Sequence, residues 1–78
     1  MAEYEEHFEI HIDGREYKVH ETSMSGAQLK TLAGKDSTYQ LFEEVEGGRD
    51  DILIPDNQTV SIRSGLRFYT VPSATFGR

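Results

Sequence analysis

The sequence predicts an α+β fold in which one helix packs on a mixed sheet of four to five strands. Short segments of alternating apolar and polar residues occur on both sides of the middle of the chain, and such alternation is typical of half-buried strands. Only residues 22–34 repeat their apolar positions with the period of a helix. A chain of 78 residues can build one hydrophobic core, so these elements are expected to form a single domain.

The N-terminal part is expected to form a β-hairpin. Residues 8–12 and 17–19 place their apolar side chains on one face, and Asp13-Gly14 lies between the two segments. Glycine accepts the positive φ that a tight turn needs, which makes Asp-Gly a strong hairpin signal. The first two strands are therefore expected to be antiparallel neighbours.

Residues 22–34 are expected to form the helix. Thr22, Ser23 or Ser25 would cap its N-terminus by accepting a backbone N–H, and Gly34 would end it in a left-handed conformation. The apolar stripe of this helix would comprise Met24, Ala27 or Gln28, Leu29 or Leu32, and Ala33.

Alternation returns after the helix, and turns rich in Gly, Pro and Asp separate the segments that show it. A right-handed crossover through the helix would place the last strand beside the first, in parallel. The β-grasp fold has this order of elements: two strands, a helix, and then further strands that end with a long one. The later strands are expected at residues 39–45, 51–55, 59–62 and 66–71.

The pattern divides the chain into three parts. Residues 1–7 are a polar lead-in and residues 8–71 form the domain. Residues 72–78 are expected to leave the domain as a flexible tail, because Pro72 cannot donate to a strand ladder. The expected core comprises Phe8, Ile10, Ile12, Tyr17, Val19, Leu29, Leu32, Leu41, Ile52, Ile54, Val60, Ile62, Leu66 and Phe68.

Composition excludes several classes of partner. The chain has no cysteine, so it forms neither disulfides nor thiolate metal sites. Its formal net charge of −6 disfavours nucleic acid and anionic membrane surfaces. No apolar run is long enough for a signal peptide or a membrane span. We therefore expect a monomeric cytoplasmic protein that needs no cofactor.

Signals of catalysis or metal binding are weak. The sequence contains no nucleophile elbow and no glycine-rich phosphate loop, so we do not expect an enzyme. His7, His11 and His20 lack a clear third metal ligand, since only His11 and His20 are expected to face each other across the hairpin. The acids of residues 43–51 lack the alternating spacing of a calcium loop and are expected to form a solvated edge.

The face of the sheet that turns away from the helix is the expected docking surface. Alternation places Phe42, Tyr69 and Val71 there, where exposed aromatic and apolar groups commonly mark a protein-binding patch. The alternative is that a bulge turns one or two of them inward, or that the tail covers them. The expected partner-binding residues are Phe42, Tyr69, Val71, His11, His20 and Phe76.

Several segments carry a resemblance to a known family: IDGREYKV, MSGAQLKTLAG, EEVEGG, IPDNQTV and GLRFYTVPSATFG. Together they resemble the bacterial multiubiquitin family, ubiquitin-like modifiers found beside bacterial relatives of ubiquitin-activating and ubiquitin-conjugating enzymes. The resemblance implies a ubiquitin-like β-grasp fold. It also implies an E1-like activating enzyme that uses ATP, an E2-like conjugating enzyme, a processing and deconjugating peptidase, and protein targets.

The C-terminal residues differ from those of ubiquitin, which ends in two glycines. Here a single Gly77 is followed by Arg78, so a peptidase would have to remove Arg78 before activation. A residue without a side chain suits the narrow channel of an adenylating enzyme. Read without the resemblance, the same residues are more typical of a frayed terminus than of a conjugation site. The candidate acceptors for chains are Lys18, Lys30 and Lys35.

Two other functions fit the same fold. A β-grasp module can bind a partner through its sheet without being conjugated. A sulfur carrier uses the same terminal glycine as a thiocarboxylate.

Overall fold

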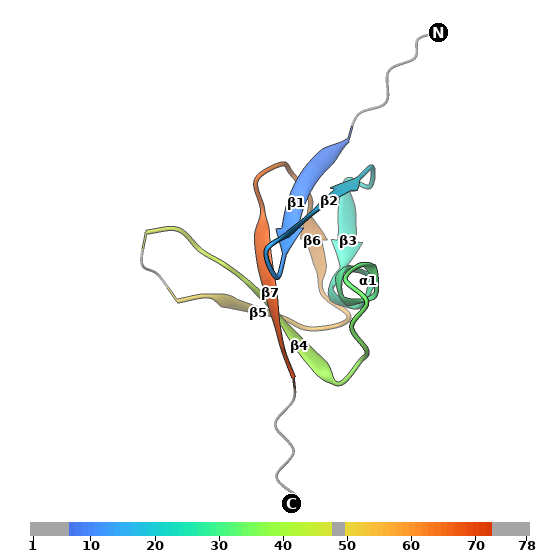
Figure 1. The fold of residues 1–78 in the computed structure, drawn as a ribbon, viewed down its shortest axis with the longest axis vertical. Helices are drawn as coiled ribbons and strands as arrows, with labels where there is room; N and C mark the ends of the chain where they lie inside the picture. Colours follow the sequence, from blue (N-terminus) through green and yellow to red (C-terminus); the bar gives the residue numbers. More distant parts are fainter. Residues whose placement is uncertain (1–6, 48–49, 73–78) are drawn as a thin grey trace, which may run out of the picture.

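A computed structural model describes residues 7–47 and 50–72, which form one short helix packed on a mixed five-stranded sheet (Figure 1). A separate two-stranded sheet lies beside the helix. The elements in chain order are β1 (Phe8–Ile12), β2 (Arg15–Val19), β3 (Ser23–Ser25), α1 (Gly26–Leu32), β4 (Tyr39–Glu43), β5 (Ile52–Ile54), β6 (Thr59–Ser61) and β7 (Arg67–Pro72).

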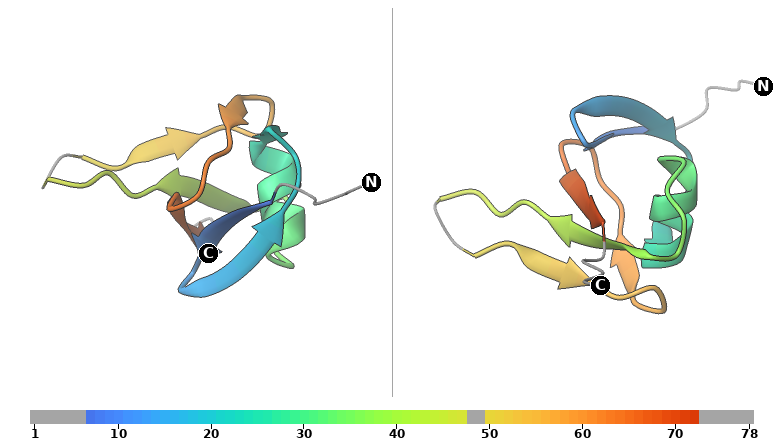
Figure 2. Two further views of the ribbon diagram at one scale, coloured as in Figure 1. Left: turned by 90° about the horizontal axis from the view of Figure 1, so that it is seen from above. Right: turned by 60° about the horizontal axis from the view of Figure 1, so that its bottom comes forward.

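The main sheet has the strand order β2-β1-β7-β4-β5, so the C-terminal strand lies at its centre. The expected parallel pairing of the first and last strands is confirmed, with His11 beside Arg67 and Ile12 beside Phe68. All other neighbours in this sheet are antiparallel. The helix covers one face of the sheet, and the described residues that follow β4 and precede β5 extend away from the body (Figure 2). This arrangement is the ubiquitin-like β-grasp fold.

The hairpin forms as the sequence predicts. Asp13 and Gly14 both have positive φ, 55° and 80°, as the two central residues of a type I′ turn require. This turn pairs Ile12 with Arg15 and Ile10 with Tyr17. The hairpin register therefore places its apolar side chains on the helix side of the sheet.

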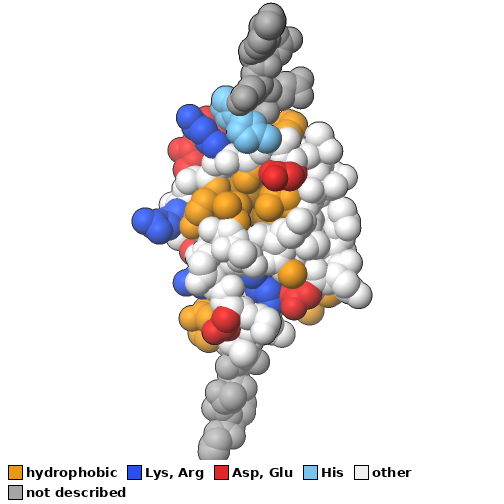
Figure 3. All heavy atoms as spheres, turned by 90° about the vertical axis from the view of Figure 1, so that its right-hand side faces the viewer, with side chains coloured by type: hydrophobic (Ala, Val, Ile, Leu, Met, Phe, Trp, Pro, Cys, Tyr) orange, Lys and Arg blue, Asp and Glu red, His pale blue; other side chains and the backbone are white. Residues whose placement is uncertain are grey.

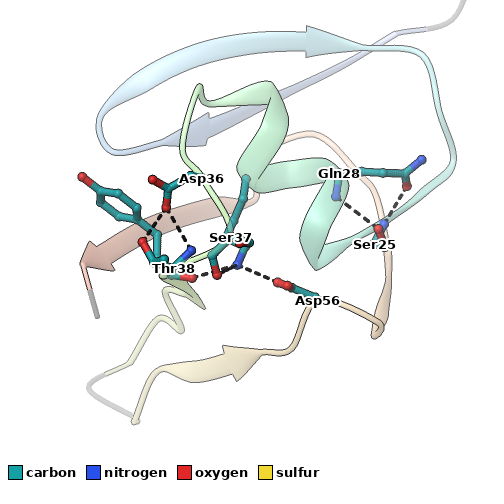
Figure 4. A network of polar contacts seen from close by, with 8 residues as sticks. Ser25, Gln28, Asp36, Ser37, Thr38 and Asp56 are labelled. Atoms are coloured by element: carbon teal, nitrogen blue, oxygen red, sulfur yellow. Dashed lines mark hydrogen bonds and ion pairs between the residues drawn. The ribbon is translucent and has the colours of Figure 1, made fainter. Parts of the chain in front are cut away.

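The expected placement of Met24 on the helix is wrong. Residues Ser23–Ser25 instead form β3, which pairs with β6 and buries Met24 opposite Val60. The helix begins at Gly26 because Ser25 is extended and closes a capping box. The hydroxyl of Ser25 accepts the N–H of Gln28 at 3.1 Å, and the side chain of Gln28 accepts the N–H of Ser25 at 2.8 Å (Figure 4). Of the three expected caps, Ser25 is therefore the one used.

The helix ends at Leu32, and Gly34 adopts the expected left-handed conformation with φ 77°. The N–H of Gly34 donates to Thr31, and the N–H of Lys35 donates to Lys30. These two bonds form a Schellman motif, which satisfies carbonyls that the end of a helix leaves unpaired. At seven residues, α1 is too short to cross a membrane, and it is the one helix of the described residues.

Most of the expected core is buried. Ile52 is an exception: it is 47% exposed, because it pairs with Glu43 at the last residue of β4, where the two strands leave the body. Phe8, Tyr17 and Leu32 are half-buried at the margin. Met24 joins the core from β3. The buried set is Ile10, Ile12, Val19, Met24, Leu29, Leu41, Ile54, Val60, Ile62, Leu66 and Phe68.

Gly26 permits the helix to start against the turn that follows β5. Its N–H donates to the carbonyl of Gln58, and a Cβ at this position would lie 2.3 Å from the carbonyl oxygen of Pro55. No side chain fits at that distance unless the backbone moves. This contact requires glycine for a steric reason, and not for its conformational freedom.

We expect Gly26→Ala to lower the free energy of unfolding by about 2 kcal/mol, because the added methyl overpacks a backbone contact. Gly34→Ala is the matched control, since its methyl would enter open space and would cost only left-handed strain of about 1 kcal/mol. Urea unfolding of both variants measures the difference. An equal or smaller loss for Gly26→Ala would contradict the steric explanation.

Candidate functional site

The outer face of the sheet, opposite the helix, carries a stacked pair of aromatic rings. Phe42 on β4 lies directly across from Tyr69 on β7. Their ring centroids are 5.3 Å apart, and the ring planes differ by 11°. Both side chains are half-buried, so neither is turned into the core. Two of the expected docking residues therefore form one apolar surface.

Two exposed aliphatic residues extend this surface. Leu53 on β5 is the other cross-strand neighbour of Phe42 and is 46% exposed. Val71 follows Tyr69 on the same face of β7 and is 37% exposed. Sequence reasoning missed Leu53, because its neighbours Ile52 and Ile54 are also apolar and alternation cannot show which face it occupies. The outer-face patch is defined as Phe42, Leu53, Tyr69 and Val71.

Asp51 fixes the edge of the outer-face patch. One of its carboxylate oxygens accepts the phenol O–H of Tyr69 at 2.7 Å, and the other accepts the N–H of Val45 at 3.2 Å. The bond to Asp51 raises the pKa of Tyr69 above the usual tyrosine value, with smaller contributions from burial and from the nearby charges of Asp51 and Glu44. A carboxylate thus holds the tyrosine ring in place and keeps its phenol protonated.

The expected pairing of His11 with His20 is wrong. The hairpin register places His11 across from Glu16, and the ring of His20 instead meets that of His7, edge to face at 6.3 Å. His11 remains on the outer face beside Arg67, so it borders the patch, whereas His20 does not. Within residues 7–47 and 50–72, no three His, Cys, Asp or Glu side chains gather to hold a metal ion.

The C-terminal strand is fixed near its end by Asp13 of the hairpin turn. One carboxylate oxygen of Asp13 accepts the N–H of Thr70 at 2.8 Å, and the other accepts the Thr70 hydroxyl at 2.6 Å. The N–H of Asp13 donates to the carbonyl of Phe68 at 3.0 Å. Asp13 therefore extends the pairing of β1 with β7 beyond the last residue of β1. Sequence reasoning treated this residue only as part of a turn.

Lys30 is a poor acceptor for chains, because it is only 4% exposed and its ammonium has three partners within the domain. Its ammonium donates to the carbonyls of Ser37 at 3.2 Å and Tyr39 at 2.8 Å, and pairs with Asp56 at 2.6 Å (Figure 4). These bonds join the helix to the loop before β4 and to the turn after β5. A nucleophilic amine would have to leave all three partners.

The other two lysines lie nearer to solvent. Lys18 on β2 is exposed. Lys35 is half-buried, with its ammonium 5.2 Å from the centre of the Tyr39 ring. In the same loop, the hydroxyl and the N–H of Thr38 donate to Asp36 and lower the pKa of that carboxyl group (Figure 4).

Three of the predicted site residues, Phe76, Gly77 and Arg78, lie outside the described residues. The structure describes the chain as far as Pro72, which is the last residue of β7. It therefore describes the strand that precedes the predicted conjugation site.

The fold and the exposed outer face define a ubiquitin-like β-grasp domain. The Multiubiquitin family model matches residues 8–73, which is most of the chain. The chain belongs to the Multiubiquitin family. Comparison with curated proteins and with solved structures finds no match.

The raised pKa of Tyr69 predicts a pH dependence. A hydrogen bond that needs the protonated phenol stabilises the fold fully below the tyrosine pKa of the unfolded chain, and this stabilisation is lost as pH rises through the higher folded-state pKa. We expect Asp51→Ala to lower the pKa of Tyr69. An alkaline NMR titration that monitors the ring resonances of Tyr69 measures this pKa. Asp51→Asn, which keeps an acceptor without the charge, should give an intermediate value. Identical titration in all three proteins would refute the role of Asp51.

Proposed function

We propose that this chain is a ubiquitin-like protein modifier that is joined to targets through the carboxyl group of Gly77. The observation that carries the proposal is membership in the Multiubiquitin family together with a C-terminal strand bound on both sides as far as Thr70. A modifier must present its terminal carboxyl group to other proteins from a body that stays folded, and β7 supplies such an anchor seven residues before Gly77.

The chemistry of the proposal begins with a peptidase that hydrolyses the bond between Gly77 and Arg78. The Gly77 carboxylate then attacks the α-phosphate of ATP and releases pyrophosphate, and the activating enzyme holds the resulting acyl adenylate. A partner thiol or hydroxyl displaces AMP to form an ester-type intermediate. A nucleophile on the target finally attacks that carbonyl and releases the partner's thiol or hydroxyl. The enzymes supply every catalytic group, and the modifier supplies only the acyl group.

The outer-face patch is the proposed docking surface for these enzymes. Its stacked rings, Phe42 and Tyr69, are already ordered, so binding them costs little conformational entropy. Lys18 and Lys35 are the proposed acceptors if chains form, because Lys30 is buried. The same patch would serve a module that is never conjugated, and the two functions differ in what happens to Gly77.

We expect Gly77→Ala to reduce adducts on other proteins at least tenfold in cells that also produce the activating, conjugating and peptidase partners, because a methyl group obstructs entry into the adenylating site. Ser73→Ala, a small change in the same segment, is the control. Denaturing gels detect adducts, and intact mass detects the loss of Arg78. Unchanged adducts with Gly77→Ala would refute conjugation through this residue. A retained Arg78 without adducts would favour the unconjugated module. A mass change that corresponds to replacement of one carboxyl oxygen of Gly77 by sulfur would favour the carrier.

A further inference from the structure

The strand β2 forms one edge of the main sheet, and its outer edge has no described neighbour. The bonds of β1 show which groups of β2 are open. The backbone groups of Glu9, His11 and Asp13 bond to β7 and to the loop before it. The backbone groups of the even-numbered residues of β1 therefore bond to β2. Arg15, Tyr17 and Val19 are consequently paired with β1.

The backbone groups of Glu16 and Lys18 therefore point outward from the sheet. Neither side chain has a hydrogen-bond or ion-pair partner among the described residues, and both are exposed. An edge of this kind can accept another strand unless charge or shape prevents it. The charges on β2 thus decide which strand can pair with it.

An apolar area lies beside this edge. On the side of the molecule that carries β2 and α1, hydrophobic side chains gather within a frame of histidine and charged groups (Figure 3). Tyr17 faces the helix from β2, because it pairs with the buried Ile10. Leu32 and Ala33 lie at the end of the helix and, like Tyr17, are half-buried against the core. The seven-residue helix leaves this margin of the core partly uncovered.

We propose that two copies of this chain associate by pairing their β2 strands antiparallel about a two-fold axis through Tyr17. This register places Glu16 opposite Lys18 of the second copy, and Lys18 opposite Glu16 of the second copy. Both residues present open backbone groups, so each such pair exchanges two N–H to carbonyl bonds. The two Tyr17 rings meet on the helix side as a non-hydrogen-bonded pair, where side chains approach most closely.

The charges of Glu16 and Lys18 favour this register and favour a second copy of the chain as the partner. Opposite charges directly across an antiparallel pair stabilise it, and like charges destabilise it. A register centred on Lys18 would place two lysines against each other. The register centred on Tyr17 instead places a glutamate opposite a lysine at two positions. A two-fold interface requires such a self-complementary surface. The two sheets would merge into one with both helices on the same face, and the outer-face patch and β7 would stay uncovered. The pairing does not require conjugation through Gly77, but it engages Lys18, which is one of the two proposed acceptors.

The test is a charge exchange followed by sedimentation at protein concentrations from about 10 µM to about 1 mM, the range that a small interface requires. Glu16→Lys and Lys18→Glu should each weaken self-association at least tenfold, because each places like charges across the axis. The double variant, with both changes, should associate like the original chain. An equimolar mixture of the two single variants should also associate, because the mixed pair has opposite charges at both positions.

A backbone control separates strand pairing from simple charge attraction. Lys18→Pro removes an N–H that points out of the sheet and forms no hydrogen bond with β1. Lys18→Thr makes the same charge change but keeps this N–H. We expect less association with proline than with threonine. Thermal unfolding and amide spectra would verify that the variants are folded. An original chain that stays monomeric at 1 mM, or single variants that associate as the original does, would overturn the proposal.

Discussion

The strand β7 is hydrogen-bonded along both of its sides, and this pairing positions the core, the outer face and the C-terminal end of the domain. β4 bonds one side of this strand, and β1 bonds the other for as long as β1 lasts. Asp13 then supplies carboxylate oxygens where β1 has ended, so the N–H of Thr70 is not left unpaired. Pro72 occupies the next position on that open side. Because proline has no N–H, the strand loses no bond there.

This pairing connects the core to the surfaces. Phe68 of β7 is almost fully buried beneath the helix, and its neighbour Tyr69 faces outward to stack on Phe42. The single strand therefore carries the centre of the core, half of the outer-face patch and the route to Gly77. Lys30 has a comparable role on the helix side, because its ammonium joins the helix to the loop before β4 and to the turn after β5. A change in the packing of β7 would alter the core and the outer face together.

Sequence reasoning succeeded where local pattern decides the structure. Asp13-Gly14 fixes the hairpin, and the helix crossover fixes the parallel pairing. It failed where a partner distant in sequence decides. Met24 fits a helical stripe as well as a strand, and only pairing with β6 selects the strand. The burial of Lys30 likewise depends on Asp56, and the bond of Asp13 depends on Thr70, neither of which a local pattern reveals.

Asp13 holds the C-terminal strand as far as Thr70. Amide hydrogen exchange of Thr70 tests this claim in Asp13→Gly, which keeps the left-handed turn but has no carboxylate. Loss of a hydrogen bond to a charged group predicts exchange about tenfold faster or more at Thr70, with the amide of Ile10 unchanged as an internal reference. Asp13→Asn, which keeps one acceptor, should retain most of the protection. Unchanged exchange at Thr70 in Asp13→Gly would contradict the claim.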